Sequence, residues 1–398
     1  MDLLPKSEAV NRLRQMQSWM QNSSVDAVLI LQNADQYYFS GTIQVGLLCL
    51  PAAGDPIYLV QKSAARARME SPWERILPMA SLRKAPEVLT GEGLKQPRRI
   101  GLEMDVLPTS YYLRFQELFP GVEFVDASEA IHQTRMIKSP YEVEQIRNAA
   151  RMLEKAFEEM PSWAHAGATE LEVSARLEGF LRLRGHQGIT RMRGFNYEIG
   201  YGTVSSGPSA GYPTCFPGPV GFIGLYPAIL NGGSLRRLEL GDSLMVDICG
   251  GYGGYIADKT RTFAVGDLAK DMCEAHEFVL RMNSEIEAML KPGTSCASIY
   301  RHTLDRVGDS PYAATFMGVG DSKVRFVGHG VGLELDELPV LASGFDLPLQ
   351  PGMTIAIEPK IFFPDHGGVG LENTYLITET GFEKLTVYRE EIIELSPK

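Results

Sequence analysis

Apolar residues in the first third of the chain recur at two alternating spacings. From Ser7 to Gln21 they recur every three or four residues, which predicts an amphipathic helix, and the apolar segment 26–31 that follows predicts a buried strand. The alternation continues with strands expected near 45–50, 57–60, 99–102 and 122–125, and helices near 62–69 and 108–118. This pattern predicts an α/β domain. It contains neither a phosphate-binding glycine motif nor clustered reactive residues, so we expect it to have a structural or pocket-shaping role.

A strong helix start marks the boundary between two expected domains. Ser139 is a helix cap, Pro140 occupies the first helical position, and helical spacing continues to about Glu159. We therefore expect an N-terminal α/β domain of residues 1–136 and a C-terminal domain of residues 137–398. A chain of 398 residues is long enough for two hydrophobic cores.

The second domain mixes helical patterns with glycine-punctuated strands. Further helices are expected over 169–185, 269–290 and 296–307. Between them, residues 193–207 resemble a strand with tight turns, and the segment up to residue 234 is crowded with Pro, Gly and aromatic residues. A long segment without periodicity inside a compact domain indicates a functional loop, or equally a dimer contact.

Residues 243–265 predict a β-hairpin in which each strand carries one aspartate. The glycine cluster 250–254 supplies the turn, and a turn centred near residue 252 or 253 brings Asp247 and Asp258 close to opposite one another, with Cβ atoms roughly 5 Å apart. Carboxylates at that distance repel unless one is protonated, each pairs with a cation, or both bind a metal ion. A solvated surface hairpin is the alternative.

Three later segments supply further candidate ligands. His329 lies between glycines, which leave its imidazole uncrowded, and Glu358 and Glu372 each occur within an apolar strand pattern. A buried, unpaired carboxylate costs several kcal/mol, on the order of 3–5. Four acids and one histidine would offset that cost around divalent metal, and this ligand set suits oxygen-preferring or borderline ions.

These residues and their surroundings resemble the pita-bread metallopeptidases. The contexts are Y-x-x-D-x-T-R-T-F around Asp258, G-H-G-V-G-L-E around His329, I-E-P around Glu358 and L-E-N-T around Glu372. The N-terminal domain and the R-M-I-K-S-P helix start resemble the branch containing Xaa-Pro aminopeptidase, prolidase and creatinase. The resemblance implies a C-terminal α+β pita-bread domain with a curved antiparallel sheet inside and helices outside.

The resemblance also implies roles for the five residues. Asp258 and Glu372 would bridge two divalent ions, Asp247 would complete one site, and His329 and Glu358 the other. Two such ions acidify a shared water and polarise a substrate carbonyl. Glu358, beside that water, is the candidate general base and proton shuttle, the alternative being that it serves only as a ligand.

The chain departs from the family pattern around the metal ligands. Where proline-specific members carry a histidine, this chain has Thr214, or Asn231 in another alignment, and Asp336 replaces a second histidine. These three are candidate substrate-binding residues. Gly370 stands where an arginine is common, an extra segment runs roughly from residue 217 to 233, and His366 is expected in a surface turn.

Composition disfavours some classes of binding partner and indicates the cellular compartment. The net charge of −11, from 38 basic and 49 acidic residues, disfavours nucleic acid or an anionic membrane as a partner. The five cysteines are scattered without a Cys-x-x-Cys pair, which indicates a reducing compartment. With no signal-peptide pattern and no apolar window long enough to span a bilayer, we expect a cytoplasmic protein.

The resulting hypothesis is a dinuclear metal-dependent hydrolase of the Xaa-Pro aminopeptidase or prolidase type, acting on a short peptide or small amide. The resemblance implies two divalent ions, which would be Mn, Co, Zn or Fe, and a homodimer. The replaced histidines leave a non-peptide C–N hydrolase or lyase on the same fold as an alternative. A non-catalytic binding homologue is a third hypothesis, which the five retained ligands disfavour.

Overall fold

The computed structural model describes residues 3–229 and 231–396. The chain divides into two compact units, residues 1–135 and 136–398. Each unit has its own sheet structure and core, so each is described by itself. In the described part of the chain no helix is long and apolar enough to cross a membrane.

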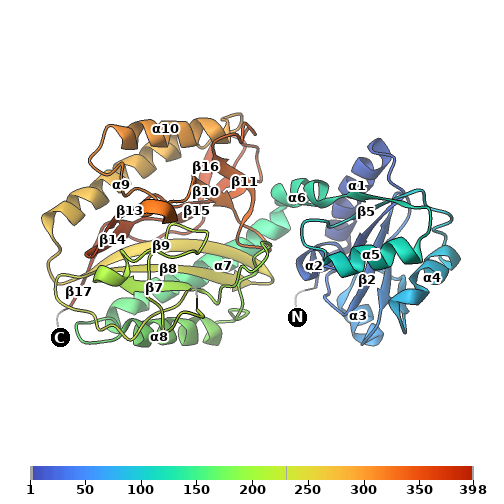
Figure 1. Cartoon of the computed structure of the whole chain (residues 1–398), viewed down its shortest axis with the longest axis horizontal. Coiled ribbons are helices and arrows are strands. Elements are labelled where there is room, and N and C mark those ends of the chain that lie inside the picture. The colour runs from blue at the N-terminus through green and yellow to red at the C-terminus, as the bar shows by residue number, and fades with distance from the viewer. Residues whose placement is uncertain (1–2, 230, 397–398) are drawn as a thin grey trace. The chain divides into compact units, whose positions relative to one another are not determined.

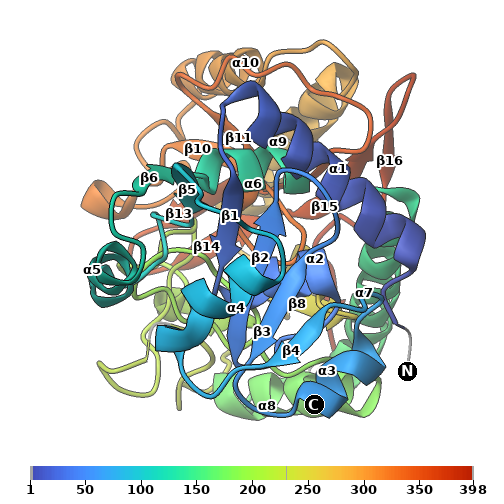
Figure 2. The ribbon, with the colours of Figure 1, turned by 90° about the vertical axis from the view of Figure 1, so that its right-hand side faces the viewer.

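The N-terminal unit is a six-stranded sheet flanked by helices, which confirms the expected α/β class (Figure 2). The strand order is β4-β3-β2-β1-β5-β6, with β1–β2 and β2–β3 antiparallel and the other neighbours parallel. The strands are β1 (Ala27–Ile30), β2 (Gly46–Pro51), β3 (Ile57–Val60), β4 (Ile76–Pro78), β5 (Arg99–Leu102) and β6 (Glu123–Asp126). The helices are α1 (Lys6–Asn22), α2 (Asn33–Ser40), α3 (Ala64–Glu70), α4 (Ala85–Gly91), α5 (Thr109–Leu118) and α6 (Ser128–Met136).

Four elements of this unit have no counterpart in the sequence prediction: α2, β4, α4 and α6. Each is at most nine residues long. A periodicity argument needs a window of about 11 residues or more, so such short elements give no clear signal.

The C-terminal unit is an α+β domain in which helices cover sheets that are antiparallel except for the parallel pair β17–β9 (Figure 1). One sheet has the order β11-β10-β12-β15-β16, a second β17-β9-β8-β7, and β13 pairs with β14. The strands are β7 (Gly202–Ser206), β8 (Ser243–Tyr252), β9 (Tyr255–Val265), β10 (Phe326–Gly330), β11 (Glu337–Ala342), β12 (Thr354–Ile357), β13 (Lys360–Phe363), β14 (Gly367–Gly370), β15 (Asn373–Ile377), β16 (Phe382–Lys384) and β17 (Ile393–Leu395). The helices are α7 (Pro140–Glu159), α8 (Glu170–Leu183), α9 (Lys270–Met289) and α10 (Cys296–Gly308).

The long hairpin of β8 and β9 differs in register from the sequence prediction. Its turn is Gly253-Gly254, and both glycines have positive φ, +57° and +91°, as a two-residue type I′ turn requires. Asp247 therefore lies opposite Thr260, and Asp258 opposite Cys249. The two aspartates are diagonal neighbours on one face of the hairpin instead of a directly opposed pair, because the turn is centred about one residue later than expected.

The segment after β7 is held by one buried carboxylate. Glu170, at the start of α8, is fully buried. Its Oε1 accepts hydrogen bonds from the backbone N (2.7 Å) and Oγ (2.8 Å) of Ser206, and its Oε2 accepts them from the backbone N (3.0 Å) and Oγ of Ser234. Glu170 thereby ties together the two ends of the segment 207–233. Of the strand pattern expected over 193–207, only β7 forms a strand.

Candidate metal centre

The five candidate ligands come from three strands and two strand ends of the C-terminal unit. Asp247 lies on β8, Asp258 on β9 and His329 on β10, while Glu358 directly follows β12 and Glu372 directly precedes β15. The structure brings all five together in two groups that share Glu372. In the group Asp258, His329 and Glu372, and in the group Asp247, Glu358 and Glu372, one ligand atom from each residue lies within 4.8 Å of the others.

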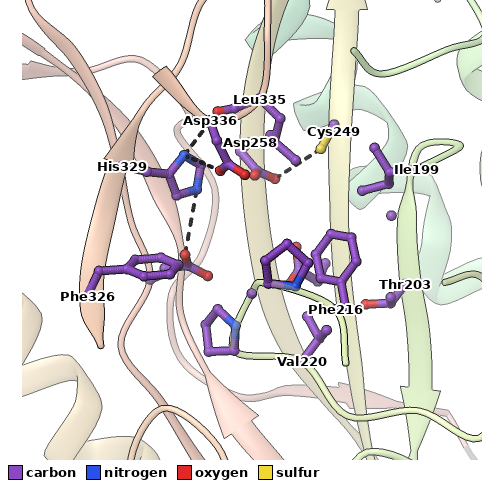
Figure 3. Close-up of a pocket in the computed structure, with 16 residues that line it drawn as sticks. Ile199, Thr203, Phe216, Val220, Cys249, Asp258, Phe326, His329, Leu335 and Asp336 are labelled. Carbon is purple, nitrogen blue, oxygen red and sulfur yellow. Dashed lines mark hydrogen bonds and ion pairs between the residues drawn. The ribbon is translucent and has the colours of Figure 1, made fainter. Parts of the chain in front are cut away.

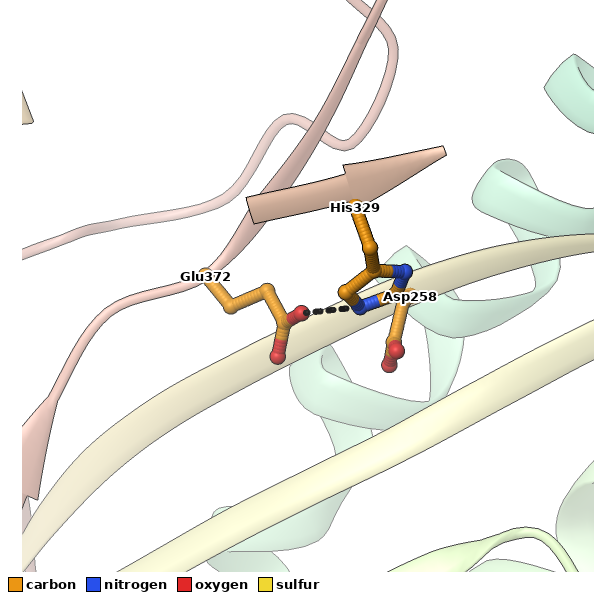
Figure 4. Close-up of side chains that lie close together, drawn as sticks. All are labelled: Asp258, His329 and Glu372. Atoms are coloured by element: carbon orange, nitrogen blue, oxygen red, sulfur yellow. Dashed lines mark ion pairs between the residues drawn. The ribbon is translucent and has the colours of Figure 1, made fainter. Parts of the chain in front are cut away.

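The first group consists of three buried residues (Figure 4). His329 Nε2 lies 4.0 Å from Glu372 Oε1 and 3.6 Å from Glu358 Oε1. On the other side of the ring, Nδ1 lies 3.0 Å from the carbonyl oxygen of Leu335. A carbonyl only accepts, so Nδ1 carries a proton and donates it there. Burial lowers the pKa of His329, but Asp336 and the other carboxylates outweigh it and raise the pKa to about 9, so Nε2 is also protonated when no metal is bound. When a metal displaces that proton, the Nε2 lone pair faces the carboxylates, as in metal-ligating histidines.

The second group surrounds a lysine that the sequence reasoning missed. Lys360, the first residue of β13, is fully buried. Its Nζ donates hydrogen bonds to Asp247 Oδ2 (2.8 Å), Glu358 Oε2 (2.8 Å) and Glu372 Oε2 (3.3 Å). The available signal was position: Lys360 follows Glu358 by two residues in an extended segment, where alternate side chains point to the same side.

Hydrogen bonds from neighbouring residues orient the shared ligand. Thr260 Oγ1 donates to Glu372 Oε2 at 2.7 Å, and Arg261 Nη1 donates to the Glu372 carbonyl at 2.8 Å. The opposite carboxylate oxygen, Glu372 Oε1, is buried and has no hydrogen-bond partner among the described residues. A buried oxygen without a donor is costly unless something positive meets it.

Burial and mutual repulsion set the electrostatics of the cluster. Burial, together with the neighbouring carboxylates, raises the pKa of Glu372 to about 8 and that of Asp258 well above its usual range. Burial also raises the pKa of Glu358 to about 7, against the opposing effect of Lys360. For Lys360 itself burial lowers the pKa, but the three carboxylates outweigh it and raise the pKa well above the usual value, so the side chain is an ammonium.

A pocket opens onto the cluster, with Asp258 and His329 of the first group and Asp247 and Glu358 of the second among its lining residues (Figure 3). Apolar side chains form much of its wall, and Thr203 and Asp336 add polar groups; the wall includes Ile199, Phe216, Val220, Phe326 and Leu335. Residues 216–220 belong to the loop after β7, so this loop forms one side of the pocket. The loop signal in the sequence therefore marked a segment that shapes the site.

The three candidate substrate-binding residues lie in different surroundings. Asp336 lines the pocket, with Oδ1 3.4 Å from His329 Nδ1. Thr214 and Asn231 are not among the lining residues: Thr214 Oγ1 accepts a hydrogen bond from Phe216 N, and Asn231 Nδ2 donates one to the Glu198 carbonyl. His366 is exposed in the turn between β13 and β14, as expected.

The fold and the cluster together define a hydrolase domain built to hold a metal among buried carboxylates. Residues 144–379 match the model of metallopeptidase family M24, and residues 12–137 match the creatinase/prolidase N-terminal domain. The chain belongs to metallopeptidase family M24, and it is an enzyme of the metal-dependent peptidase class.

The relatives include proteins named as dipeptidases. The Xaa-Pro dipeptidase of Pyrococcus furiosus is 29% identical over 384 residues, which cover 96% of this chain and 99% of that protein. The Xaa-Pro dipeptidase from Bacillus anthracis is 26% identical, with a TM-score of 0.82 over 97% of this chain and 100% of that one. The prolidase from Pyrococcus horikoshii is 26% identical, with a TM-score of 0.81 over 96% and 100%.

Family membership implies divalent metal, and the residues of the first group fit such an ion. Two carboxylates and one imidazole nitrogen are a donor set that borderline divalent ions accept. The buried Glu372 Oε1 lacks a hydrogen-bond partner among the described residues, and His329 directs Nε2 toward it. In the second group the oxygens already contact an ammonium.

Proposed function

We propose that this protein is a metal-dependent peptidase that cleaves short peptides of the Xaa-Pro dipeptide class. One observation carries the proposal: buried Asp258, His329 and Glu358 line a pocket with apolar walls, and buried Glu372 lies in the same cluster, 4.0 Å from His329 Nε2. The names of the relatives support the substrate class. We further propose a homodimer located in the cytoplasm; the five free cysteines support a reducing compartment.

Asp258, His329 and Glu372 would hold the ion, with Glu358 beside them. A divalent ion bound there would supply Lewis acidity for carbonyl and water activation, and Mn, Co, Zn and Fe are all compatible with these donors. The geometry of the first group suits His329 as a metal ligand, because the hydrogen bond from its Nδ1 to the Leu335 carbonyl fixes the tautomer.

Glu358 is the proposed proton acceptor. Its Oε2 is engaged by Lys360, whereas its Oε1 faces His329 Nε2 at 3.6 Å, toward the pocket. A carboxylate with one oxygen held and the other facing the reaction space is positioned to take a proton from an attacking water and to pass it to the leaving amine. The apolar wall provided by Phe216 and Val220 limits competing water.

The test is hydrolysis of a dipeptide panel, with proline and non-proline second residues, by chelator-treated enzyme reloaded with each ion separately. We expect cleavage that the chelator abolishes and that favours Xaa-Pro substrates. Absence of cleavage of any peptide, or activity indifferent to the chelator, contradicts the proposal. Glu358→Gln should lower kcat about 100-fold or more, the usual contribution of a general base.

The metal content of Glu358→Gln separates the two roles considered for this residue. If Glu358 acts only as a proton acceptor, the substitution should leave the metal content unchanged. If Glu358 is an essential ligand, the substitution should lower the metal content. Glu379→Gln, the same change at an exposed position seven residues after Glu372, is the matched control and should leave both metal and activity unchanged.

A further inference from the structure

Lys360 places a fixed positive charge inside the cluster that the family resemblance assigns to two metal ions. We propose that the Lys360 ammonium replaces one of these ions, so that the centre binds a single divalent ion at Asp258, His329 and Glu372. The inference rests on the proposed function in taking the cluster to be the metal centre. It then goes further by assigning the number of ions and the group that replaces the second.

The contacts of Lys360 use all of its hydrogen-bonding capacity. An ammonium has three N–H donors, and Nζ has three carboxylate partners, one each from Asp247, Glu358 and Glu372, at 2.8, 2.8 and 3.3 Å. These are the residues of the second group. A divalent ion bound to the same oxygens would sit about 2.0–2.2 Å from them and therefore against the ammonium, with no ligand between the two positive charges.

The neighbouring strand is adapted to the lysine side chain. Lys360 pairs with Gly370 across β13 and β14, and a Cβ atom at position 370 would lie 2.4 Å from Lys360 Cγ. No side chain fits there while Lys360 keeps its path to the carboxylates. The glycine that departs from the family pattern and the lysine in the cluster are thus two parts of one arrangement.

The first group keeps what one ion needs. The two oxygens of Glu372 have different surroundings. Oε2 accepts hydrogen bonds from Lys360 and Thr260, whereas Oε1 is buried without a hydrogen-bond partner among the described residues and lies 4.0 Å from His329 Nε2. With all four carboxylates ionised, as metal binding requires, the single ammonium leaves three negative charges in the site, and one divalent ion reduces this to one. Lys360 occupies one oxygen of each second-group carboxylate, Asp247 Oδ2, Glu358 Oε2 and Glu372 Oε2, so an ion bound to these three oxygens would have to displace it.

The direct test is the number of ions bound by the full-length protein. Metal-free protein is dialysed against excess Mn²⁺, washed, and analysed for metal and protein. We expect one Mn²⁺ per chain and an electron paramagnetic resonance spectrum without exchange coupling. Two ions per chain, or a coupled spectrum, overturns the inference while leaving the proposed peptidase function intact.

Two substitutions at one position separate the space that Lys360 fills from its charge. Lys360→Ala vacates the space and should raise the content to two ions per chain, with a coupled spectrum through Glu372. Lys360→Met removes the charge but keeps most of the bulk and should stay at one. Lys270→Ala, at an exposed position on α9, is the matched control and should not differ from the unsubstituted protein.

The remaining outcomes are also decisive. A folded Lys360→Ala variant that still binds only one ion contradicts the inference. If that variant does not fold, the stoichiometry and spectrum of the unsubstituted protein decide by themselves. One bound ion without hydrolysis of any peptide supports the inference and contradicts the proposed function, whereas no bound ion contradicts both.

Discussion

Glu170 is the best position at which to test how the pocket wall is held in place. Its two carboxylate oxygens accept hydrogen bonds from the backbone N–H groups of Ser206 and Ser234, at 2.7 and 3.0 Å, in a fully buried position. In Glu170→Gln one oxygen becomes an NH₂ group, which cannot accept. One of the two backbone N–H groups then faces another donor and loses its partner.

The expected loss follows from the hydrogen bonds concerned. A hydrogen bond to a charged group contributes about 1.5–3 kcal/mol, and a buried N–H left unsatisfied costs about 1–3 kcal/mol. The serine hydroxyls can rotate to accept, which offsets part of this. We therefore expect local destabilisation of about 3 kcal/mol, which corresponds to about 100-fold faster hydrogen exchange if exchange proceeds through local opening.

The assay is hydrogen exchange of the amides at Ser206 and Ser234, together with peptide hydrolysis. Because residues 216–220 line the pocket, loosening their anchor should raise KM more than it lowers kcat. Glu172→Gln, two residues along the same helix and outside this network, is the control and should change exchange there much less. Equal effects of the two substitutions, or unchanged exchange in Glu170→Gln, would refute the reasoning.

Two further predictions follow from buried charges. Burial raises the pKa of Glu372 to about 8 and of Glu358 to about 7, from 4.5. The metal-free native protein therefore holds protons that the unfolded chain has lost, so its stability falls as pH rises from about 4.5 to 8. A divalent ion prefers the charged carboxylates, so added metal should raise Tm more at pH 8 than at pH 5.5; an equal rise at both contradicts this. Lys259 Nζ is buried without a hydrogen-bond partner among the described residues, and burial lowers its pKa to about 6. Lys259→Met should raise the free energy of unfolding by about 1–3 kcal/mol in urea titrations, unlike Lys270→Met, and a loss of stability would contradict it.

The elements predicted well from sequence are those with long periodic patterns or a clear cap. Helix α7 begins at Pro140 and ends at Glu159, as its cap and spacing indicated, because Ser139 and Glu142 form a capping box. Strands β3 and β5 have the predicted bounds. The five candidate ligands, proposed from charged or imidazole side chains in apolar or glycine-rich segments and from the family resemblance, do lie close together in the structure.

Side-chain partners across the sheets were less accessible. The sequence predicted that Asp247 and Asp258 lie directly opposite one another. Because the turn is displaced by about one residue, Asp247 instead lies opposite Thr260, and Asp258 opposite Cys249. A shift of this size changes every cross-strand pair in a hairpin, and the four glycines within 250–254 offer several places for the turn. Sequence pattern alone does not select among them.

The environment of Lys360 shows why a complete ligand set does not by itself define a metal centre. The five candidate ligands can be picked out one segment at a time, but the number of ions also depends on which other cations reach the same oxygens. Lys360 reaches three of them only because β13 and β14 pair it with a glycine. This arrangement depends on five positions that only the folded chain brings together: 247, 358, 360, 370 and 372. A lysine is also a cation that chelators cannot remove. A centre built this way keeps one positive charge among its carboxylates at any metal concentration, and it requires only one ion from solution.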